Sequence, residues 1–339
     1  MRGFGHTMAN KVLVTGGAGY IGSILVAALL RRGDHVTVLD DLWFGGESLL
    51  PFLAFDTFHL FKRDLCDEQS LRGVMDGVDS VVHLAAIVGF PACDKARRSF
   101  VWQLNVEGTK RVYQAATSAN VSRMIFASSY SNYGESSHGE LVTEESPLYP
   151  KSTYAESKIE AEQFLLAQQN PNQTATICLR LATVFGVSPR TRFDLMANQF
   201  ILEAFTRNKL ILYQEDFKRS FVHVRDVVRA IMLVMNAPLE KVHNQVFNVG
   251  SERLNTSKKD LAALIQARLP ELEVEYRNTS FLGDMRSIHV SFEKIRRTLG
   301  YEVSIDLEQG IDELLWALRH GVISDPISEK YRNHPPMMS

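Results

Sequence analysis

Residues 11–22 read KVLVTGGAGYIG, and this stretch decides the fold of the chain. The apolar run Lys11–Thr15 predicts a buried strand, and glycines follow at Gly16, Gly19 and Gly22. An apolar-periodic helix is expected next, over Tyr20–Arg32. Glycines between a strand and a helix let the backbone approach a diphosphate, whose charge the helix N-terminus stabilises. The stretch therefore predicts a strand–turn–helix unit that binds a dinucleotide.

The next predicted strand, His35–Asp40, ends in two acidic residues, Asp40 and Asp41. Asp40 lies about 20 positions beyond the glycines, where an acidic side chain accepts hydrogen bonds from the adenosine ribose. The same negative charge repels a 2′-phosphate. The sequence therefore favours NAD over NADP as the cofactor.

Further strands are expected in alternation with helices. The strands are predicted over Thr57–Phe61, Asp79–Leu84, Val121–Ala127, Thr174–Leu181 and Gln245–Gly250, and two long helices over Lys95–Ser118 and Ser152–Gln169. This alternation predicts an α/β fold with a doubly wound parallel Rossmann sheet. At 339 residues the chain is long enough for a second unit, and we expect a smaller C-terminal α/β substrate lobe.

We assign residues 10–186 plus roughly 223–250 to the dinucleotide-binding domain, because the predicted strands fall there. Residues 187–222 plus 251–325 form the expected substrate lobe, and residues 1–9 and 326–339 are expected to be tails.

Composition narrows the class of protein. Hydrophobic residues make up 45% of the chain, and the net charge is -2 with acidic and basic residues interleaved, which argues against a general nucleic-acid-binding surface. Cys66, Cys93 and Cys178 are widely spaced, so neither a disulfide framework nor a metal site is expected. The sequence has no N-terminal signal core and no apolar run of membrane-spanning length. We expect a cytoplasmic protein with no membrane partner.

The segment Tyr154-Ala155-Glu156-Ser157-Lys158 opens the second long helix. Positions i and i+4 lie on one helix face, so the phenol and the ammonium are expected side by side. A neighbouring positive charge lowers the pKa of a phenol from about 10. Lysine and an oxidised nicotinamide together would make Tyr154 a usable base near neutral pH. A surface helix with an unrelated tyrosine and lysine is the alternative interpretation.

These motifs occur in one order, joined by Asp64-Leu65, by His83-Leu84-Ala85-Ala86 and by Ser128-Ser129 at a strand end. In that order they resemble the extended short-chain dehydrogenase/reductase superfamily, in its branch of NAD-dependent nucleotide-sugar epimerases and dehydratases. The resemblance runs from Lys11 to about Leu318, nearly the whole chain.

The resemblance implies catalytic roles for Ser129, Tyr154 and Lys158. In the family, a serine or threonine closing the fifth strand hydrogen-bonds the sugar hydroxyl that is oxidised. Ser129 occupies that position, and Ser128 is the alternative. Lys158 would also anchor the nicotinamide ribose. The cofactor-binding residues that the resemblance implies are Gly16, Gly19, Tyr20, Ile21, Gly22, Asp40, Asp41, Asp64, Leu65, Leu84, Ala85, Ala86, Asn105, Tyr154, Lys158 and Leu181.

The resemblance also implies a substrate, a nucleotide-diphosphate sugar linked to UDP or GDP. Its binding residues would be Val88, Ser129, Ser131, Thr183, Arg192, Arg219 and Arg286. Arg219 and Arg286 would bind the diphosphate, because a guanidinium binds phosphate oxygens bidentately. Arg190 and Arg192 are either surface charges or residues that close over the substrate. Thr183 is a departure, since the family usually carries a substrate-binding asparagine there.

Family dehydratases carry acidic residues directly after the catalytic hydroxyl residue, whereas Tyr130, Ser131 and Asn132 follow Ser129 here. The resemblance therefore implies an epimerase that oxidises the sugar at C4 transiently and recycles NADH. The alternative is a 4-dehydrogenase that releases the keto sugar, because residues 179–194 and 221–227 resemble GDP-heptose 4-dehydrogenases. A non-catalytic NAD-sensing protein is a third hypothesis.

Relatives in the family often pair through the helices that correspond to Lys95–Ser118 and Ser152–Gln169. The resemblance therefore implies a homodimer.

Overall fold

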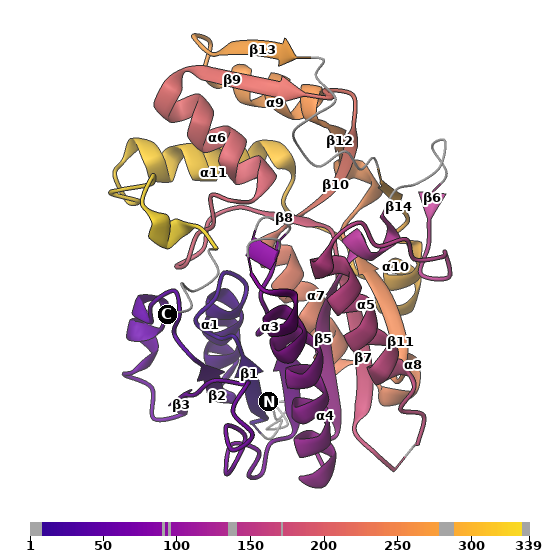
Figure 1. The fold of residues 1–339 in the computed structure, drawn as a ribbon. Helices are drawn as coiled ribbons and strands as arrows, with labels where there is room; N and C mark the ends of the chain where they lie inside the picture. Colours follow the sequence, from indigo (N-terminus) through magenta and orange to yellow (C-terminus); the bar gives the residue numbers. More distant parts are fainter. Residues whose placement is uncertain are drawn as a thin grey trace, which may run out of the picture.

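A seven-stranded parallel sheet forms the centre of the molecule (Figure 1). The computed structural model describes residues 9–89, 92–93, 96–134, 141–170, 172–277 and 288–333. The strands are β1 (Lys11–Thr15), β2 (His35–Asp40), β3 (Phe58–Lys62), β4 (Ser80–His83), β5 (Arg123–Ser129), β7 (Ala175–Leu181) and β11 (Gln245–Val249). Their order is β11-β7-β5-β4-β1-β2-β3, and every neighbouring pair is parallel. The order reverses direction at β1, so the predicted doubly wound Rossmann sheet is confirmed.

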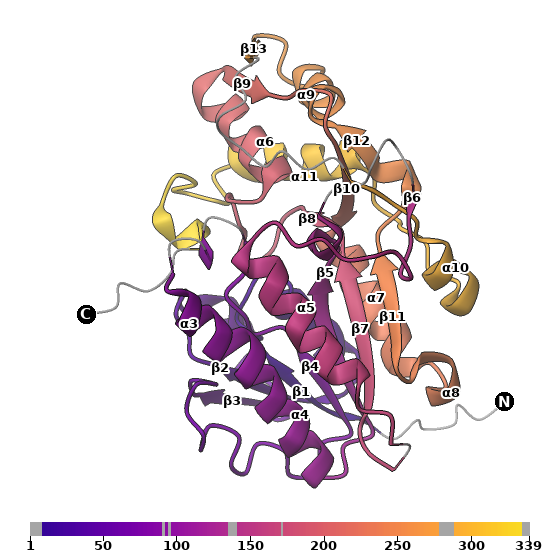
Figure 2. The same ribbon diagram turned by 45° about the vertical axis from the view of Figure 1, so that its right-hand side comes forward.

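Helices cover both faces of this sheet. One face carries α1 (Gly22–Arg32) and α7 (Val224–Asn236), which contact each other. The other carries α3 (Arg98–Trp102), the π-helical turn η2 (Gln103–Glu107), α4 (Gly108–Ser118) and α5 (Thr153–Leu166). Figure 2 shows α3, α4 and α5 side by side in front of the strands.

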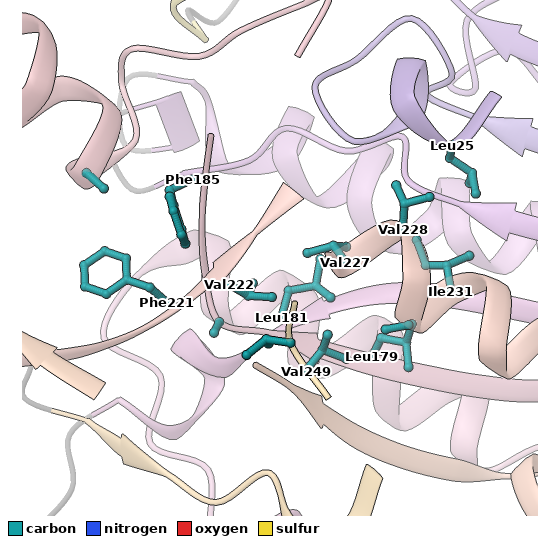
Figure 3. Close-up of a cluster of buried hydrophobic side chains, with 14 of the residues drawn as sticks. Leu25, Leu179, Leu181, Phe185, Phe221, Val222, Val227, Val228, Ile231 and Val249 are labelled. Atoms are coloured by element: carbon teal, nitrogen blue, oxygen red, sulfur yellow. The ribbon is translucent and has the colours of Figure 1, made fainter. Parts of the chain in front are cut away.

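Burial on both faces explains why the strands read as continuous apolar runs. Side chains alternate along β1, so Val12 and Val14 pack with α1 and α7 while Leu13 packs into the cluster under α4 and α5. Figure 3 shows the first of these cores, where Leu25 of α1 lies near Val228 and Ile231 of α7. The two cores fix the positions of the strand ends.

The helix expected as one piece over Lys95–Ser118 is interrupted, and its first residue lies outside the described ranges. The π-helical turn Gln103–Glu107 adds a bulge at Asn105. The Asn105 side chain accepts a hydrogen bond from Ile87 N at 2.8 Å and donates to Ile87 O at 3.0 Å. It also donates to Ser157 Oγ at 3.0 Å. These tertiary bonds account for a bulge that helical periodicity does not predict.

A smaller lobe lies beyond the strand ends, at the top of Figure 1. It contains β8 (Thr183–Phe185), α6 (Met196–Arg207), β9 (Lys209–Tyr213), β10 (Lys218–His223), β12 (Asn255–Ser257), α9 (Lys258–Gln266), β13 (Glu273–Arg277) and α11 (Leu307–Arg319). Strands β12, β10 and β8 form one sheet, and β13 pairs with β9 in another. An α/β lobe was predicted, whereas the exact division of the chain between the two domains stays a prediction.

The remaining elements are short. They are η1 (Glu47–Phe52), η3 (Tyr130–Tyr133), β6 (Leu141–Val142), α8 (Leu239–Val242), η5 (Glu252–Leu254), β14 (His289–Val290), α10 (Glu293–Leu299) and η6 (Glu329–Tyr331). The stretch around η6 was expected to be a tail, yet it packs on the lobe, because Phe193 N donates to Tyr331 O at 2.8 Å. None of the helices in the described ranges is long and apolar enough to cross a membrane.

His83 lies inside β4 and is 1% exposed. Its Nδ1 lies 2.6 Å from Thr15 Oγ1, and its Nε2 lies 3.0 Å from Thr109 Oγ1. The Thr109 hydroxyl donates its proton to Asn105 O, so Nε2–H donates to Thr109 and Nδ1 accepts from Thr15. Burial, helped by the nearby charge of Lys158, lowers the pKa of His83 to about 3.

This pKa predicts how stability depends on pH. The folded-state pKa lies below the unfolded value of about 6.5, so only the unfolded state takes up this proton between the two values. Above pH 6.5 His83 does not change how the free energy of unfolding depends on pH. As the pH falls towards 4, it lowers the free energy of unfolding by about 1.4 kcal/mol per pH unit. Urea unfolding of His83→Gln should therefore show a shallower loss of stability with acid than the native protein. The exposed His35→Gln is the control and should keep the native slope; equal slopes in His83→Gln and the native protein would contradict a neutral buried His83.

Candidate active site

A cavity of about 830 Å³ lies where the carboxyl ends of the sheet strands meet the small lobe. Open parallel sheets bind their ligands at this edge. Most of the residues predicted from sequence line this one cavity. They are Gly16, Gly19, Tyr20, Ile21, Gly22, Asp40, Asp41, Leu65, Leu84, Ala85, Ala86, Val88, Ser129, Ser131, Tyr154, Lys158, Leu181, Thr183, Arg192 and Arg219.

The glycine-rich turn leaves no room for side chains. A Cβ on Gly16, whose φ is +74°, would lie 2.7 Å from Ala85 N, and a Cβ on Gly22 would lie 2.2 Å from Gly16 O. Helix α1 begins directly after this turn, and no side chain caps its N-terminus. A tight backbone cradle next to an open helix N-terminus fits the diphosphate of a dinucleotide.

The acidic end of β2 borders the turn. The two Asp40 carboxylate oxygens accept hydrogen bonds from Ala18 N and Leu42 N, both at 2.9 Å. Asp41 Oδ1 accepts from Trp43 N at 3.0 Å, and burial raises the pKa of Asp41 to about 6. Both carboxylates line the cavity, and their negative charge suits a ribose without a 2′-phosphate.

Helix α5 presents Tyr154 and Lys158 to the same cavity. It begins after Ser152, whose hydroxyl accepts from Ala155 N at 3.2 Å. Lys158 Nζ donates to Ala127 O at 2.8 Å and lies 4.6 Å from the centre of the Phe126 ring. Burial lowers the pKa of Lys158 to about 8, so the ammonium is largely protonated at neutral pH.

The two serines at the end of β5 have different surroundings. Both serines line the cavity, but Ser128 Oγ donates to Glu162 Oε2 at 2.6 Å and accepts from Asn132 Nδ2 at 3.1 Å. Ser129 Oγ accepts from Ser131 N at 3.1 Å and keeps its own proton for a ligand. Successive side chains of a strand point to opposite faces. The geometry therefore favours Ser129 over Ser128 as the hydroxyl that meets a substrate.

The substrate side of the cavity contains Thr183 and two arginines. Thr183 Oγ1 lies 2.7 Å from the Tyr130 hydroxyl. Arg192 is 8% exposed and binds Asp194 with two hydrogen bonds, of 3.1 and 2.6 Å. Arg219 of β10 is 2% exposed. Buried guanidinium groups in a cavity wall suit an anionic ligand, although Asp194 already offsets much of the charge of Arg192.

Two predicted residues bond to other parts of the protein, and a third is not described. Asp64 binds Cys66 N at 2.8 Å, and Asn105 is committed to Ile87 and Ser157. Neither is among the described residues that line the cavity. Arg286 lies outside the described residues.

Sequence reasoning missed several lining residues. Tyr130 follows the catalytic serine position, and Lys258 opens α9, where its Nζ donates to Tyr213 O at 2.9 Å. The sequence did not decide whether Arg190 is a surface charge or a residue that closes over the substrate. In the structure it lies in the cavity wall and is 7% exposed. Asn333 reaches the cavity from the expected tail. No motif or periodicity marks Lys258, Arg190 or Asn333, because only the folding of distant segments brings them to the cavity.

A buried ion pair supports the strand end behind Ser129. Arg180 of β7 binds Glu162 of α5, with Nη2 at 2.5 Å from Oε1 and Nε at 3.1 and 3.2 Å from the two oxygens. Arg180 Nη1 also donates to the Tyr133 hydroxyl at 2.8 Å, and that hydroxyl donates to Asn248 Oδ1 at 2.7 Å. The pair therefore links α5, β5, β7 and β11.

Fold and cavity together define a class of protein, an enzyme that binds a dinucleotide at the strand ends and places a phenol beside it. The sequence profile of the NAD dependent epimerase/dehydratase family matches residues 12–250. The chain belongs to this family, and its cofactor is NAD, as the acidic end of β2 predicts.

Similar proteins cover nearly the whole chain. A dTDP-glucose 4,6-dehydratase of Streptomyces griseus is 30% identical, over 94% of this chain and 98% of that protein. The structure of a dTDP-glucose 4,6-dehydratase from Streptomyces venezuelae with NAD bound has a TM-score of 0.82 at 26% identity, over 94% and 100% of the two chains. The UDP-glucose 4-epimerase of Thermotoga maritima has a TM-score of 0.81 at 26% identity, over 92% and 99%.

Replacing one member of the buried Arg180–Glu162 pair should lower the free energy of unfolding far more than replacing both. Arg180→Met leaves the Glu162 carboxylate buried without its partner, which should cost about 3–5 kcal/mol of unfolding free energy. Arg180→Met with Glu162→Leu should recover much of that loss. The exposed pair Arg98–Glu156 is the control, and Arg98→Met should cost about 1 kcal/mol or less. Urea unfolding measures these three variants beside the native protein. A double variant as unstable as Arg180→Met would contradict the role given to the pair.

Proposed function

We propose that this chain is an NAD-dependent nucleotide-sugar 4-epimerase, which oxidises C4 of the sugar transiently and returns the hydride to it. One arrangement carries the proposal. Ser129, Tyr154 and Lys158 line a single cavity between the dinucleotide cradle and the small lobe. NAD, when bound, supplies a hydride acceptor to that cavity.

The residues divide the proton chemistry among them. Ser129 Oγ retains a proton with which to orient the sugar hydroxyl. Tyr154 is the base that removes the hydroxyl proton, and the buried ammonium of Lys158, one helical turn away, favours its ionised form. Reversal of the same transfers, after the 4-keto sugar has turned over in the cavity, produces the epimer.

Dehydration is disfavoured by the residues directly after Ser129. Several relatives are dTDP-glucose 4,6-dehydratases. In family dehydratases, acidic residues at this point protonate the leaving hydroxyl and remove the C5 proton. Here Tyr130 and Ser131 line the cavity, and the Tyr130 hydroxyl is bonded to Thr183. Neither side chain is a carboxylic acid, so these two positions do not supply the acid and base that water elimination requires.

The small lobe would bind the diphosphate of the substrate. Arg219 lies in the cavity wall with Arg192, and Lys258 adds a third cationic side chain there. Charged donors that converge on one cavity suit a diphosphate. We therefore propose a UDP- or GDP-linked sugar as the substrate.

We also propose that the protein forms a homodimer through α3–α4 and α5. Light scattering that shows only a 38.2 kDa species would refute the homodimer.

A 4-dehydrogenase that releases its keto product is the second candidate. One observation favours it. The Tyr130–Thr183 hydrogen bond, 2.7 Å long, places a fixed polar contact where the family usually has an asparagine. A sugar held by this pair would turn over less readily. A protein that only senses NAD would not require Ser129, Tyr154 and Lys158 in one cavity.

The deciding experiment incubates the purified protein, without added NAD, with a panel of UDP-, GDP- and dTDP-sugars. Sugar NMR and absorbance at 340 nm are followed together. Inversion at C4 without accumulated NADH supports the epimerase. A keto sugar formed with stoichiometric NADH supports the dehydrogenase. A 6-deoxy-4-keto product would overturn both proposals.

Tyr154→Phe should lower kcat by about 10²–10⁴-fold, because it removes the base while keeping the ring. NAD affinity should change little, which separates this effect from loss of the cofactor. Tyr276→Phe, at an exposed tyrosine of β13, is the matched control and should keep native turnover. Native kcat in Tyr154→Phe would rule out the mechanism.

A further inference from the structure

Arg190 is a buried cation in the wall of the cavity that the proposed mechanism does not use. It belongs to the loop between β8 and α6 and is 7% exposed. Its guanidinium lies 4.3 Å from the centre of the Phe44 ring, which comes from the loop after β2. Both side chains line the cavity.

The direct hydrogen-bond partners of this guanidinium are neutral. Nη1 donates to Asn333 Oδ1 at 2.7 Å, and Nη2 donates to Arg332 O at 3.2 Å. Nε is buried and has no hydrogen-bond partner among the residues that the structure describes. Burial, together with repulsion from Arg192, lowers the pKa of Arg190 to about 10, so the group stays charged at neutral pH. A buried cation in a cavity wall, hydrogen-bonded only to neutral groups, favours an anionic ligand.

The position of the loop indicates which anion is near. Ser188 Oγ donates to Tyr20 O at 2.7 Å, and the Tyr20 hydroxyl donates to Gly186 O at 2.7 Å. These bonds hold the Arg190 loop against the start of α1, where the glycine cradle fits a diphosphate. On the other side, Asp40 attracts Arg190 electrostatically. Arg190 therefore lies beside the adenosine half of the cofactor site.

The C-terminal stretch holds this loop in place. Phe193 N donates to Tyr331 O at 2.8 Å, and the two rings pack edge to face with centres 5.7 Å apart. Asn333 then fixes the Arg190 head group through its side-chain oxygen. Three segments distant in sequence, residues 42–46, 186–193 and 329–333, thus meet at one guanidinium.

We propose that the Arg190 guanidinium binds the diphosphate of NAD, and that Phe44 and Asn333 hold it in place as a clasp over the cofactor. Burial of the guanidinium is then compensated by the ligand charge. The inference depends on the NAD cofactor and not on the proposed reaction. The diphosphate is the same in NAD⁺ and NADH, so the clasp should retain both forms equally.

The test measures binding and not turnover. Dissociation constants for NAD⁺, NADH, ADP-ribose, adenosine, UDP and GDP are determined by calorimetry for the native protein and for Arg190→Gln. A lost charge-assisted hydrogen bond should weaken NAD⁺, NADH and ADP-ribose by about tenfold or more. Adenosine, which has no diphosphate, should bind unchanged. Arg207→Gln, at the exposed end of α6, is the matched control and should match the native protein throughout.

Three results would overturn the clasp. A dissociation constant for NAD⁺ in Arg190→Gln within twofold of the native value would show that Arg190 does not contact the diphosphate. Equal weakening of adenosine would place the contact on the nucleoside. Weaker binding of UDP or GDP with unchanged ADP-ribose would assign Arg190 to the substrate.

Asn333→Ala supplies a second test that preserves the arginine and serves even if Arg190→Gln does not fold. It removes the Nη1 tether, so NADH should leave faster in stopped-flow fluorescence while the thermal midpoint of the protein without ligand stays close to native. NADH release at the native rate in Asn333→Ala would contradict the clasp.

Discussion

The buried pair between Arg180 and Glu162 is the constraint on which the geometry of the site depends. It joins the middle of α5 to β7, and the same carboxylate receives the Ser128 hydroxyl at the end of β5. Because Ser128 points into this pair, Ser129 faces the cavity. Glu162 lies one turn beyond Lys158 on α5, so the pair also fixes the helix that carries Tyr154 and Lys158. This buried interaction therefore ties together the elements that carry all three proposed catalytic groups.

The sheet and the small lobe contribute different kinds of group to the site. The sheet supplies a backbone cradle, in which Gly16 and Gly22 leave no space for a Cβ, together with the acidic end of β2. The small lobe supplies buried cations, among them Arg219 and Arg192. A rigid cradle suits a cofactor that is retained, and a cationic lobe suits a diphosphate-linked substrate that enters and leaves. The loop that carries Arg190 touches both halves.

The sequence predicts the parts of the structure that local rules govern. The strand and helix on either side of the glycines, the strand that ends at Asp40 and the helix that carries Tyr154 and Lys158 all occur as expected, since each follows from the geometry of one element. Local rules cannot place Asn105, which a π-helical turn directs to Ile87, or Asp64, which binds the backbone at Cys66. They also cannot predict Arg190 meeting Asn333 across 143 positions, because only the completed fold brings these residues together.

Hydride transfer from sugar C4 is the central claim, and an isotopic label tests it most directly. Nucleotide sugars that carry deuterium at C4 are mixed with the enzyme in a single turnover, and the label is traced by NMR in the sugar and the cofactor. Hydride transfer predicts that deuterium passes to NAD and either remains in NADH or returns to C4 of the product, without dilution by water. Loss of the label to solvent, or product that forms without deuterium ever appearing in the cofactor, would contradict it.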